Sequence, residues 1–141
     1  MLIIGNDHAG TELKNALIAW LKENKIPFKN HGTDGEESVD YPDFAKAVCQ
    51  DLASNSGDLG LLICGSGNGI AMAANKYRDI RAALCWKPEL ASLAREHNNA
   101  NVLVLPARFI SVSEGINMLD VFLKTEFEGG RHQRRIDKIG C

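Results

Sequence analysis

The fold is decided by the stretch Leu59-Gly60-Leu61-Leu62-Ile63-Cys64-Gly65-Ser66-Gly67-Asn68-Gly69. Residues 59–64 form a continuous apolar run, which is typical of a strand covered on both faces of a parallel sheet. Glycines then occupy alternate positions, and an alanine-rich segment of helical character follows. The stretch therefore predicts a buried strand, a tight glycine loop and a helix.

The same alternation continues on both sides of this stretch. Helical periodicity is clearest before it, where Leu13, Leu17 and Leu21 recur on one face. Two further helices are predicted to begin near Pro42 and near Pro88, and another is predicted over residues 113–123. The predicted strands are residues 2–5, 28–31, 59–64, 80–85 and 101–105. This pattern predicts an open, doubly wound α/β sheet that binds ligands at the carboxyl ends of its strands.

Length and composition favour one ordinary globular domain spanning residues 1–141. The chain has 45% hydrophobic and 24% charged residues and a net charge of −2, so nothing in its overall charge favours nucleic acid. Its apolar runs are too short to span a bilayer, and it opens with no basic, signal-like segment. We therefore expect a cytoplasmic protein that binds neither nucleic acid nor membrane.

The four cysteines are widely spaced, with no C-x-x-C pair and no histidine at zinc-ligand spacing. We expect neither disulfides nor a structural metal. Cys49 and Cys85 are predicted to be small buried hydrophobes.

The glycine loop at residues 65–69 is the first candidate site. Its backbone amides, with a helix start behind them, can hold a phosphate or a developing oxyanion. Ile70 breaks the G-x-G-x-x-G dinucleotide pattern, no Gly-Lys pair forms a P-loop, and Cys64 breaks the G-x-S-x-G elbow. The alternative is a tight turn that merely needs small residues.

Cys64 ends the central strand beside this loop. A helix N-terminus lowers a thiol pKa, so Cys64 is predicted to be a reactive base. The alternative is a core cysteine with no chemical role.

Other polar residues follow predicted strands or end predicted helices. Asp7 and His8 follow the first strand, and Asp40 opens a helix; either aspartate could equally be a helix cap. His97 closes the fourth predicted helix, where it could serve only as a favourable charge.

A basic cluster near the end of the chain contains Arg131, His132, Arg134 and Arg135, and Arg108 follows the fifth strand. The forked guanidinium group of arginine suits bidentate phosphate binding, so the cluster is a candidate phosphate site. The alternative is a surface tail exposed to solvent.

Taken together, these motifs resemble the ribose-5-phosphate isomerase type B family, which also includes galactose-6-phosphate and allose-6-phosphate isomerases. The resemblance runs the length of the chain. It is carried by Asp7-His8, Gly32-Thr33, Asp40-Tyr41-Pro42, residues 63–70, Ala74-Asn75-Lys76, Arg81-Ala82, His97-Asn98, Asn101-Val102-Leu103 and residues 129–133.

The resemblance implies a Rossmann-like three-layer sandwich with a five-stranded parallel sheet and a C-terminal helix used in dimerisation. It implies a homodimer or a tetramer whose active site is shared between subunits. The implied catalytic residues are Cys64 as base, Ser66 as the hydroxyl that relays a proton between O1 and O2, and His97 for ring opening. The enediolate would be held by the amides of Gly65, Gly67, Asn68 and Gly69.

Further implied contacts go to the sugar hydroxyls and to the phosphate of a small sugar phosphate. The hydroxyls would be bound by Asp7, Asp40, Tyr41 and Asn98, and the phosphate by His8, Arg108, Arg131 and Arg135. A second branch of the family has a small residue at position 64 and a glutamate base at position 70. Cys64 and Ile70 place this chain with the cysteine branch.

The chemistry implied by the resemblance agrees with the residues. Moving a proton between C1 and C2 through an enediolate needs a base, a proton relay and an anion hole, and no metal or organic cofactor. We therefore expect an isomerase of D-ribose 5-phosphate and D-ribulose 5-phosphate in the pentose phosphate pathway. The alternatives are a hexose-6-phosphate isomerase and a non-catalytic module that binds sugar phosphates.

Overall fold

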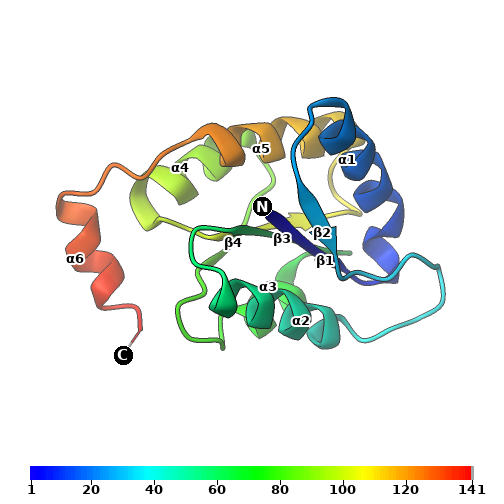
Figure 1. Ribbon diagram of the computed structural model, residues 1–141, viewed down its shortest axis with the longest axis horizontal. Coiled ribbons are helices and arrows are strands. Elements are labelled where there is room, and N and C mark those ends of the chain that lie inside the picture. The colour runs from blue at the N-terminus through cyan, green and yellow to red at the C-terminus, as the bar shows by residue number, and fades with distance from the viewer. Residues whose placement is uncertain (141) are drawn as a thin grey trace.

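The computed structural model of the chain describes residues 1–140. Strands and helices alternate along the chain, as the sequence predicts (Figure 1). The strands are β1 (Leu2–Asn6), β2 (Phe28–Asn30), β3 (Leu59–Cys64), β4 (Ala82–Leu84) and β5 (Val102–Pro106). The helices are the short 3₁₀ helix η1 (His8–Gly10), α1 (Thr11–Glu23), α2 (Tyr41–Ser54), α3 (Asn68–Ala74), α4 (Pro88–Asn98), α5 (Val112–Lys124) and α6 (Arg131–Asp137).

The five strands form one parallel sheet in the order β2-β1-β3-β5-β4. The predicted parallel α/β sheet is therefore confirmed, and β3 has the predicted bounds. The edge strands β2 and β4 are shorter than predicted, with three residues each. An edge strand pairs on one side only, so its ends are not held in the ladder by a second neighbour.

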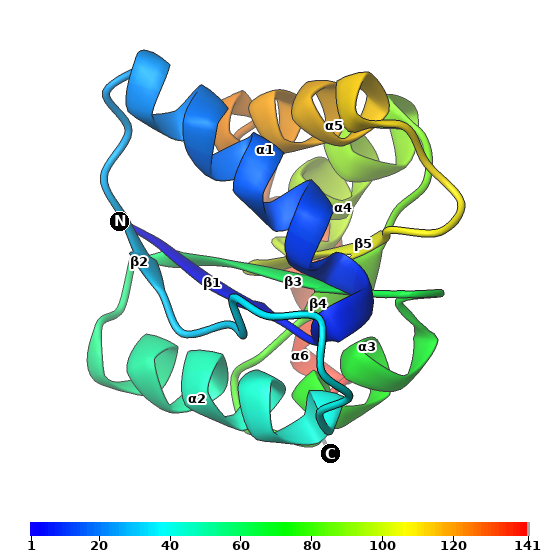
Figure 2. The ribbon, with the colours of Figure 1, turned by 90° about the vertical axis from the view of Figure 1, so that its right-hand side faces the viewer.

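Helices cover both faces of the sheet and make a three-layer sandwich (Figure 2). One apolar core lies between the sheet and α1, α4 and α5, and a second lies between the sheet and α2 and α3. Successive residues of β3 alternate between the two cores: Leu61 and Ile63 belong to the first, and Leu62 and Cys64 to the second. This double burial explains why the strand reads as an unbroken apolar run.

Local signals set the starts of the helices. Pro42 and Pro88 lie in the first turns of α2 and α4, as predicted. Helix α5 begins at Val112 because Ser111 and Glu114 form a reciprocal capping box. Cys49 and Cys85 are 2% and 1% exposed, which confirms their prediction as core residues.

None of the helices within residues 1–140 is both long and apolar enough to cross a membrane. Helix α6 lies at one end of the molecule, beyond the sheet, and packs against α4 (Figure 1).

Candidate active site

The chain reverses its direction across the sheet between β1 and β3. From β1 it continues to β2 on one side, and from β3 it continues to β4 and β5 on the other. In open α/β sheets, such a switch point leaves a crevice at the carboxyl ends of the two strands. Asp7 follows β1 and Cys64 ends β3, so both lie at this crevice.

The glycine loop packs too tightly for side chains. Gly67 has φ +79°, a left-handed conformation, and a Cβ there would meet the side chain of Leu84. A Cβ at Gly65 would lie 3.1 Å from a guanidinium nitrogen of Arg108, and one at Gly69 would lie 2.6 Å from the hydroxyl oxygen of Tyr41. The loop thus brings Arg108 and Tyr41 against its own backbone.

Cys64 is only 5% exposed. Burial raises the pKa of its thiol, and the carboxylate of Asp7 adds to the rise, while backbone hydrogen bonds from Ile70, Gly67 and Ser66 lower it in part. The net direction corrects the sequence-based expectation that the helix N-terminus would make this thiol acidic, because desolvation outweighs the amides. The backbone amides of the glycine loop do lie close to the thiol, as expected.

Ser66 and Asn68 are the exposed members of the loop, on either side of the buried Gly67. The amide of Asn68 donates to Ser66 Oγ at 3.3 Å. A small polar molecule at the crevice would therefore meet a hydroxyl close to the buried thiol.

The two aspartates differ in their use as helix caps. Asp7 accepts a hydrogen bond from the amide of Ala9 at 3.0 Å and so caps η1, although it also lies close enough to affect Cys64. Asp40 stands at the N-cap position of α2, but its side chain accepts no capping hydrogen bond from the described residues, and it is exposed. Its carboxylate is therefore available for a ligand.

His8 sits in η1, directly after Asp7. Its Nδ1 accepts a hydrogen bond from the amide of Val39 at 3.2 Å. Asp40 and Tyr41 directly follow Val39 along the chain. The loop that precedes α2 therefore forms one side of the crevice.

The second group of predicted site residues lies at the opposite edge of the sheet, where the amino ends of the strands are. We call this the amino edge and the edge with the crevice the carboxyl edge. Helix α4 runs back from the carboxyl end of β4, so His97 and Asn98 lie at its far end, near the start of β5. The side chain of Arg81, just before β4, donates to the carbonyl of Asn98 at 3.0 Å. The six residues of β3 span about 16 Å between these two edges.

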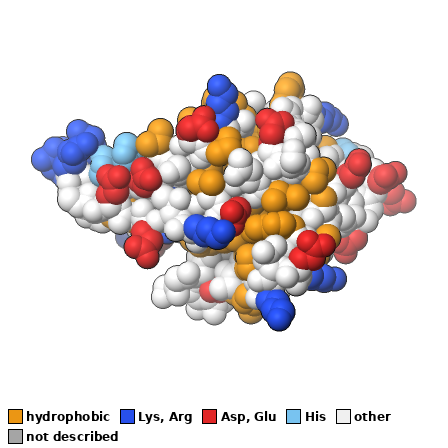
Figure 3. All heavy atoms as spheres, turned by 90° about the horizontal axis from the view of Figure 1, so that it is seen from above, with side chains coloured by type: hydrophobic (Ala, Val, Ile, Leu, Met, Phe, Trp, Pro, Cys, Tyr) orange, Lys and Arg blue, Asp and Glu red, His pale blue; other side chains and the backbone are white. Residues whose placement is uncertain are grey.

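Helix α6 adds its basic residues to this second group. His132 is 4% exposed and stacks on His97 with the ring centroids 4.3 Å apart. Arg131 and Arg135 are exposed. Figure 3 shows Lys and Arg side chains gathered at the end of the molecule where α6 lies, with His side chains beside them.

His97, His132 and Glu128 also offer ligand atoms within 4.8 Å of one another. The two imidazole rings are nearly parallel, at 15°, so their in-plane lone pairs do not converge on one ion. This arrangement fits a stacked pair with a nearby carboxylate better than a metal centre.

The predicted site residues thus form two groups. At the carboxyl edge lie Asp7, His8, Asp40, Tyr41, the glycine loop, Cys64 and Arg108. At the other edge lie His97, Asn98, Arg131 and Arg135. The sequence-based interpretation missed the stacking of His132 on His97. A signal was available, because His132 and Ile136 are four residues apart and would form one buried face of a helix.

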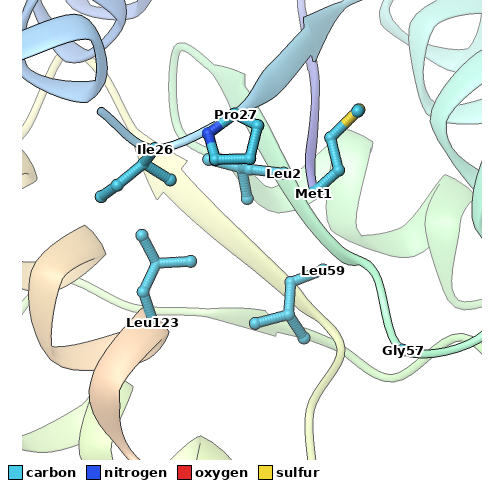
Figure 4. A pocket seen from close by; sticks show the side chains of 7 residues that line it. All are labelled: Met1, Leu2, Ile26, Pro27, Gly57, Leu59 and Leu123. Atoms are coloured by element: carbon cyan, nitrogen blue, oxygen red, sulfur yellow. The ribbon is translucent and has the colours of Figure 1, made fainter. Parts of the chain in front are cut away.

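Two hollows lie away from the crevice. A cavity of about 140 Å³ at the amino ends of β1 and β3 is lined largely by apolar side chains such as Leu2, Ile26 and Leu123, and these offer no acid, base or charge (Figure 4). A polar cleft of about 660 Å³ lies between α6 and the segment that joins α3 to β4.

Comparison with known proteins gives consistent matches over nearly the whole chain. The family model described as ribose/galactose isomerase matches residues 2–139. A probable ribose-5-phosphate isomerase B of Mycoplasma genitalium is 49% identical over 98% of this chain and 92% of its own length.

Solved structures give the same result. A ribose 5-phosphate isomerase of Thermotoga maritima superposes with a TM-score of 0.96 at 53% identity, covering 99% of this chain and 96% of the other. A ribose-5-phosphate isomerase B of Mycoplasma genitalium with bound ribulose-5-phosphate has a TM-score of 0.94 at 48% identity, with coverages of 98% and 92%.

Proposed function

The chain belongs to the ribose/galactose isomerase family, and on this basis we propose that it interconverts D-ribose 5-phosphate and D-ribulose 5-phosphate. The observation that carries the proposal is the buried Cys64 at the switch point, beside a loop of backbone amides. A similar protein, 48% identical, was solved with ribulose-5-phosphate bound. We also propose a cytoplasmic location and a role in the pentose phosphate pathway, where this aldose and ketose are interconverted.

The proposed reaction begins with ring opening, in which His97 moves the proton of the furanose hydroxyl. Cys64, as thiolate, then takes the proton from C2 of the open aldose, and the C1 carbonyl oxygen becomes an enediolate oxygen held by the loop amides. Ser66 relays a proton from O2 to O1. The thiol finally returns its proton to C1, which leaves a carbonyl at C2 and a hydroxyl at C1.

The base must be ionised, although burial raises the pKa of Cys64 within a single chain. Positive charge brought close to the thiol would lower this pKa and increase the thiolate fraction. Such charge would come from the arginines of the second group of site residues.

We propose that the two groups meet between two chains of a homodimer. His97, Asn98, Arg131 and Arg135 of one chain would complete the crevice of the other, because within a single chain the length of β3, about 16 Å, separates the two ends of the sheet where the two groups lie. Helix α6 extends beyond the sheet and is separated from the α3–β4 segment by the polar cleft, which leaves it available to a second copy. A tetramer would be a pair of such dimers. Light scattering should give at least twice the chain mass of 15.4 kDa.

Incubation with ribose 5-phosphate, allose 6-phosphate and galactose 6-phosphate, with and without a chelator, tests the proposed function. We expect ketose to form fastest from ribose 5-phosphate and at the same rate in the chelator. Faster turnover of a hexose phosphate would make the protein a hexose-6-phosphate isomerase. Binding without any ketose would make it a non-catalytic module.

A further inference from the structure

Residues 31–40 form an extended loop between β2 and α2, and it is held against the end of β1. The amide of His31 donates to the carbonyl of Ile4 at 2.8 Å, and that of Thr33 donates to the carbonyl of Asn6 at 3.2 Å. The loop then leads to Asp40 and Tyr41 at the crevice. Its placement therefore affects the site.

Lys14 is a fully buried lysine with 0% exposure, on the first turn of α1. Its Nζ donates to the carbonyl oxygen of Thr33 at 2.7 Å and pairs with the carboxylate of Asp34. A buried ammonium group is costly unless it is paired and hydrogen-bonded, so the loop must stay in place for this residue to be accommodated. The proposed reaction leaves Lys14 without a role.

Asn6 and Thr11 hold the same segment. Asn6 Nδ2 donates to the carbonyl of Thr33 at 3.1 Å, and Thr11 Oγ1 donates to the carbonyl of Gly35 at 2.8 Å. Both side chains are buried. We call Asn6, Thr11 and Lys14 the loop clamp.

The clamped loop reaches His8 through Val39. The Val39 amide can donate to His8 Nδ1 only while that nitrogen keeps its lone pair. A neutral His8 then carries its proton on Nε2. That N–H is a hydrogen-bond donor for an anion at the crevice.

We propose that the loop clamp, with Lys14 at its centre, is a positioning device that fixes His8 as the Nε2–H tautomer and presents it as a donor to the substrate phosphate. The tautomer stands on the hydrogen bond from Val39 to His8 and on the clamp contacts that hold the loop. The phosphate as acceptor rests on the proposed function.

The tautomer of His8 is measured by long-range ¹H–¹⁵N NMR of the imidazole rings, with the His8 signals assigned from a His8→Asn spectrum. The wild-type protein should show the Nε2–H form. Lys14→Met should release the loop and give a mixture of tautomers, whereas Lys22→Met, an exposed lysine on the same helix, should change nothing. A wild-type Nδ1–H form, or a folded Lys14→Met protein that keeps a pure Nε2–H signal, would overturn the proposal.

Two further variants keep the test decisive if Lys14→Met does not fold. Thr11→Val removes, at nearly constant volume, the hydroxyl that donates to Gly35 and accepts from Asn6. Val39→Pro removes the N–H that faces His8, with Val39→Ala as its control. Both Thr11→Val and Val39→Pro should shift the tautomer, and unchanged spectra would refute the clamp.

Kinetics separate positioning from simple stability. With ribose 5-phosphate, we expect Val39→Pro to raise KM about tenfold, as for a lost hydrogen bond to a charged group, and to change kcat little. An unchanged KM with a shifted tautomer would refute the phosphate role alone. A wild-type protein without turnover would instead contradict the proposed function and leave the tautomer measurement standing.

Discussion

Replacing Gly69 with alanine should weaken substrate binding without weakening the fold. Gly69 is the second residue of α3, so its backbone is helical and accepts alanine. The new methyl group would collide with Cζ of Tyr41 and would lie 2.6 Å from its hydroxyl oxygen and 2.7 Å from its Cε1. Ordinary contacts begin near 3.4 Å, so the ring must move by most of an ångström or more.

The size of the effect follows from where Tyr41 sits. The residue is 37% exposed, so its ring can swing outward without opening a core. Alanine in place of glycine in a helix contributes up to about 1 kcal/mol of stability, which offsets the lost ring contacts. We propose that Tyr41 donates a hydrogen bond to the sugar, and loss of one such bond costs about 0.5–1.5 kcal/mol, or roughly a twofold to tenfold rise in KM.

Steady-state kinetics and thermal unfolding of Gly69→Ala, Tyr41→Ala and the double variant check this reasoning. KM should rise in Gly69→Ala while the melting temperature stays within a few degrees. In the Tyr41→Ala background, the glycine substitution should have almost no further effect on KM, because the clash has been removed. Additive effects of the two substitutions would refute the proposed displacement of Tyr41.

Other substitutions test the remaining roles. Cys64→Ser should lower kcat by about a hundredfold to ten thousandfold and block exchange of the C2 proton with solvent, whereas a merely packed thiol would leave kcat intact. Wild-type kcat/KM should fall as the pH is lowered and the Cys64 thiolate is protonated, and a profile without this acid limb would count against a thiolate base. His97→Asn should lower kcat much more for ribose 5-phosphate than for ribulose 5-phosphate, because ribulose 5-phosphate has no furanose form. The equilibrium constant fixes the ratio of the two kcat/KM values, so kcat is the quantity to compare. Equal losses of kcat in both directions would argue against ring opening. Arg131→Ala and Arg135→Ala should each raise KM for the sugar phosphate, and an unchanged KM would leave α6 as a solvated surface.

The sequence predicted the centre of the fold well because several local signals agree there. The apolar run of β3 is buried on both faces, and Gly67 needs a left-handed backbone, so the bounds of the strand and the position of the loop follow from local chemistry. The ends of β2 and β4 were less predictable because they depend on pairing with one neighbour.

The properties of Cys64 and Lys14 depend on distant parts of the chain. The pKa of Cys64 reflects a balance between desolvation by the surrounding core and local amides, and the sequence displays only the amides. Lys14 stands beside the apolar stripe of α1, where a lysine is normally solvated. Its burial depends on the carbonyl of Thr33 and the carboxylate of Asp34, which are nineteen and twenty residues away. Neither outcome has a local sequence signal.

The division of the site residues between two edges of the sheet is a consequence of topology. His97 ends a helix that returns to the amino edge, so its distance from Cys64 follows once the strand order is known. Periodicity alone does not give that order. Our central claim is that these two edges form one isomerase site between two chains.

Mixing two inactive variants tests this claim most directly. Cys64→Ala and His97→Asn proteins are each assayed with ribose 5-phosphate, then unfolded together in equal amounts, refolded and assayed again. In a symmetric dimer with shared sites, half of the dimers are mixed and each has one intact site, so activity should return to about a quarter of wild type. If the refolded mixture exchanges subunits, as mass spectrometry can verify, and stays as inactive as its components, Cys64 and His97 do not act in one site built from two chains.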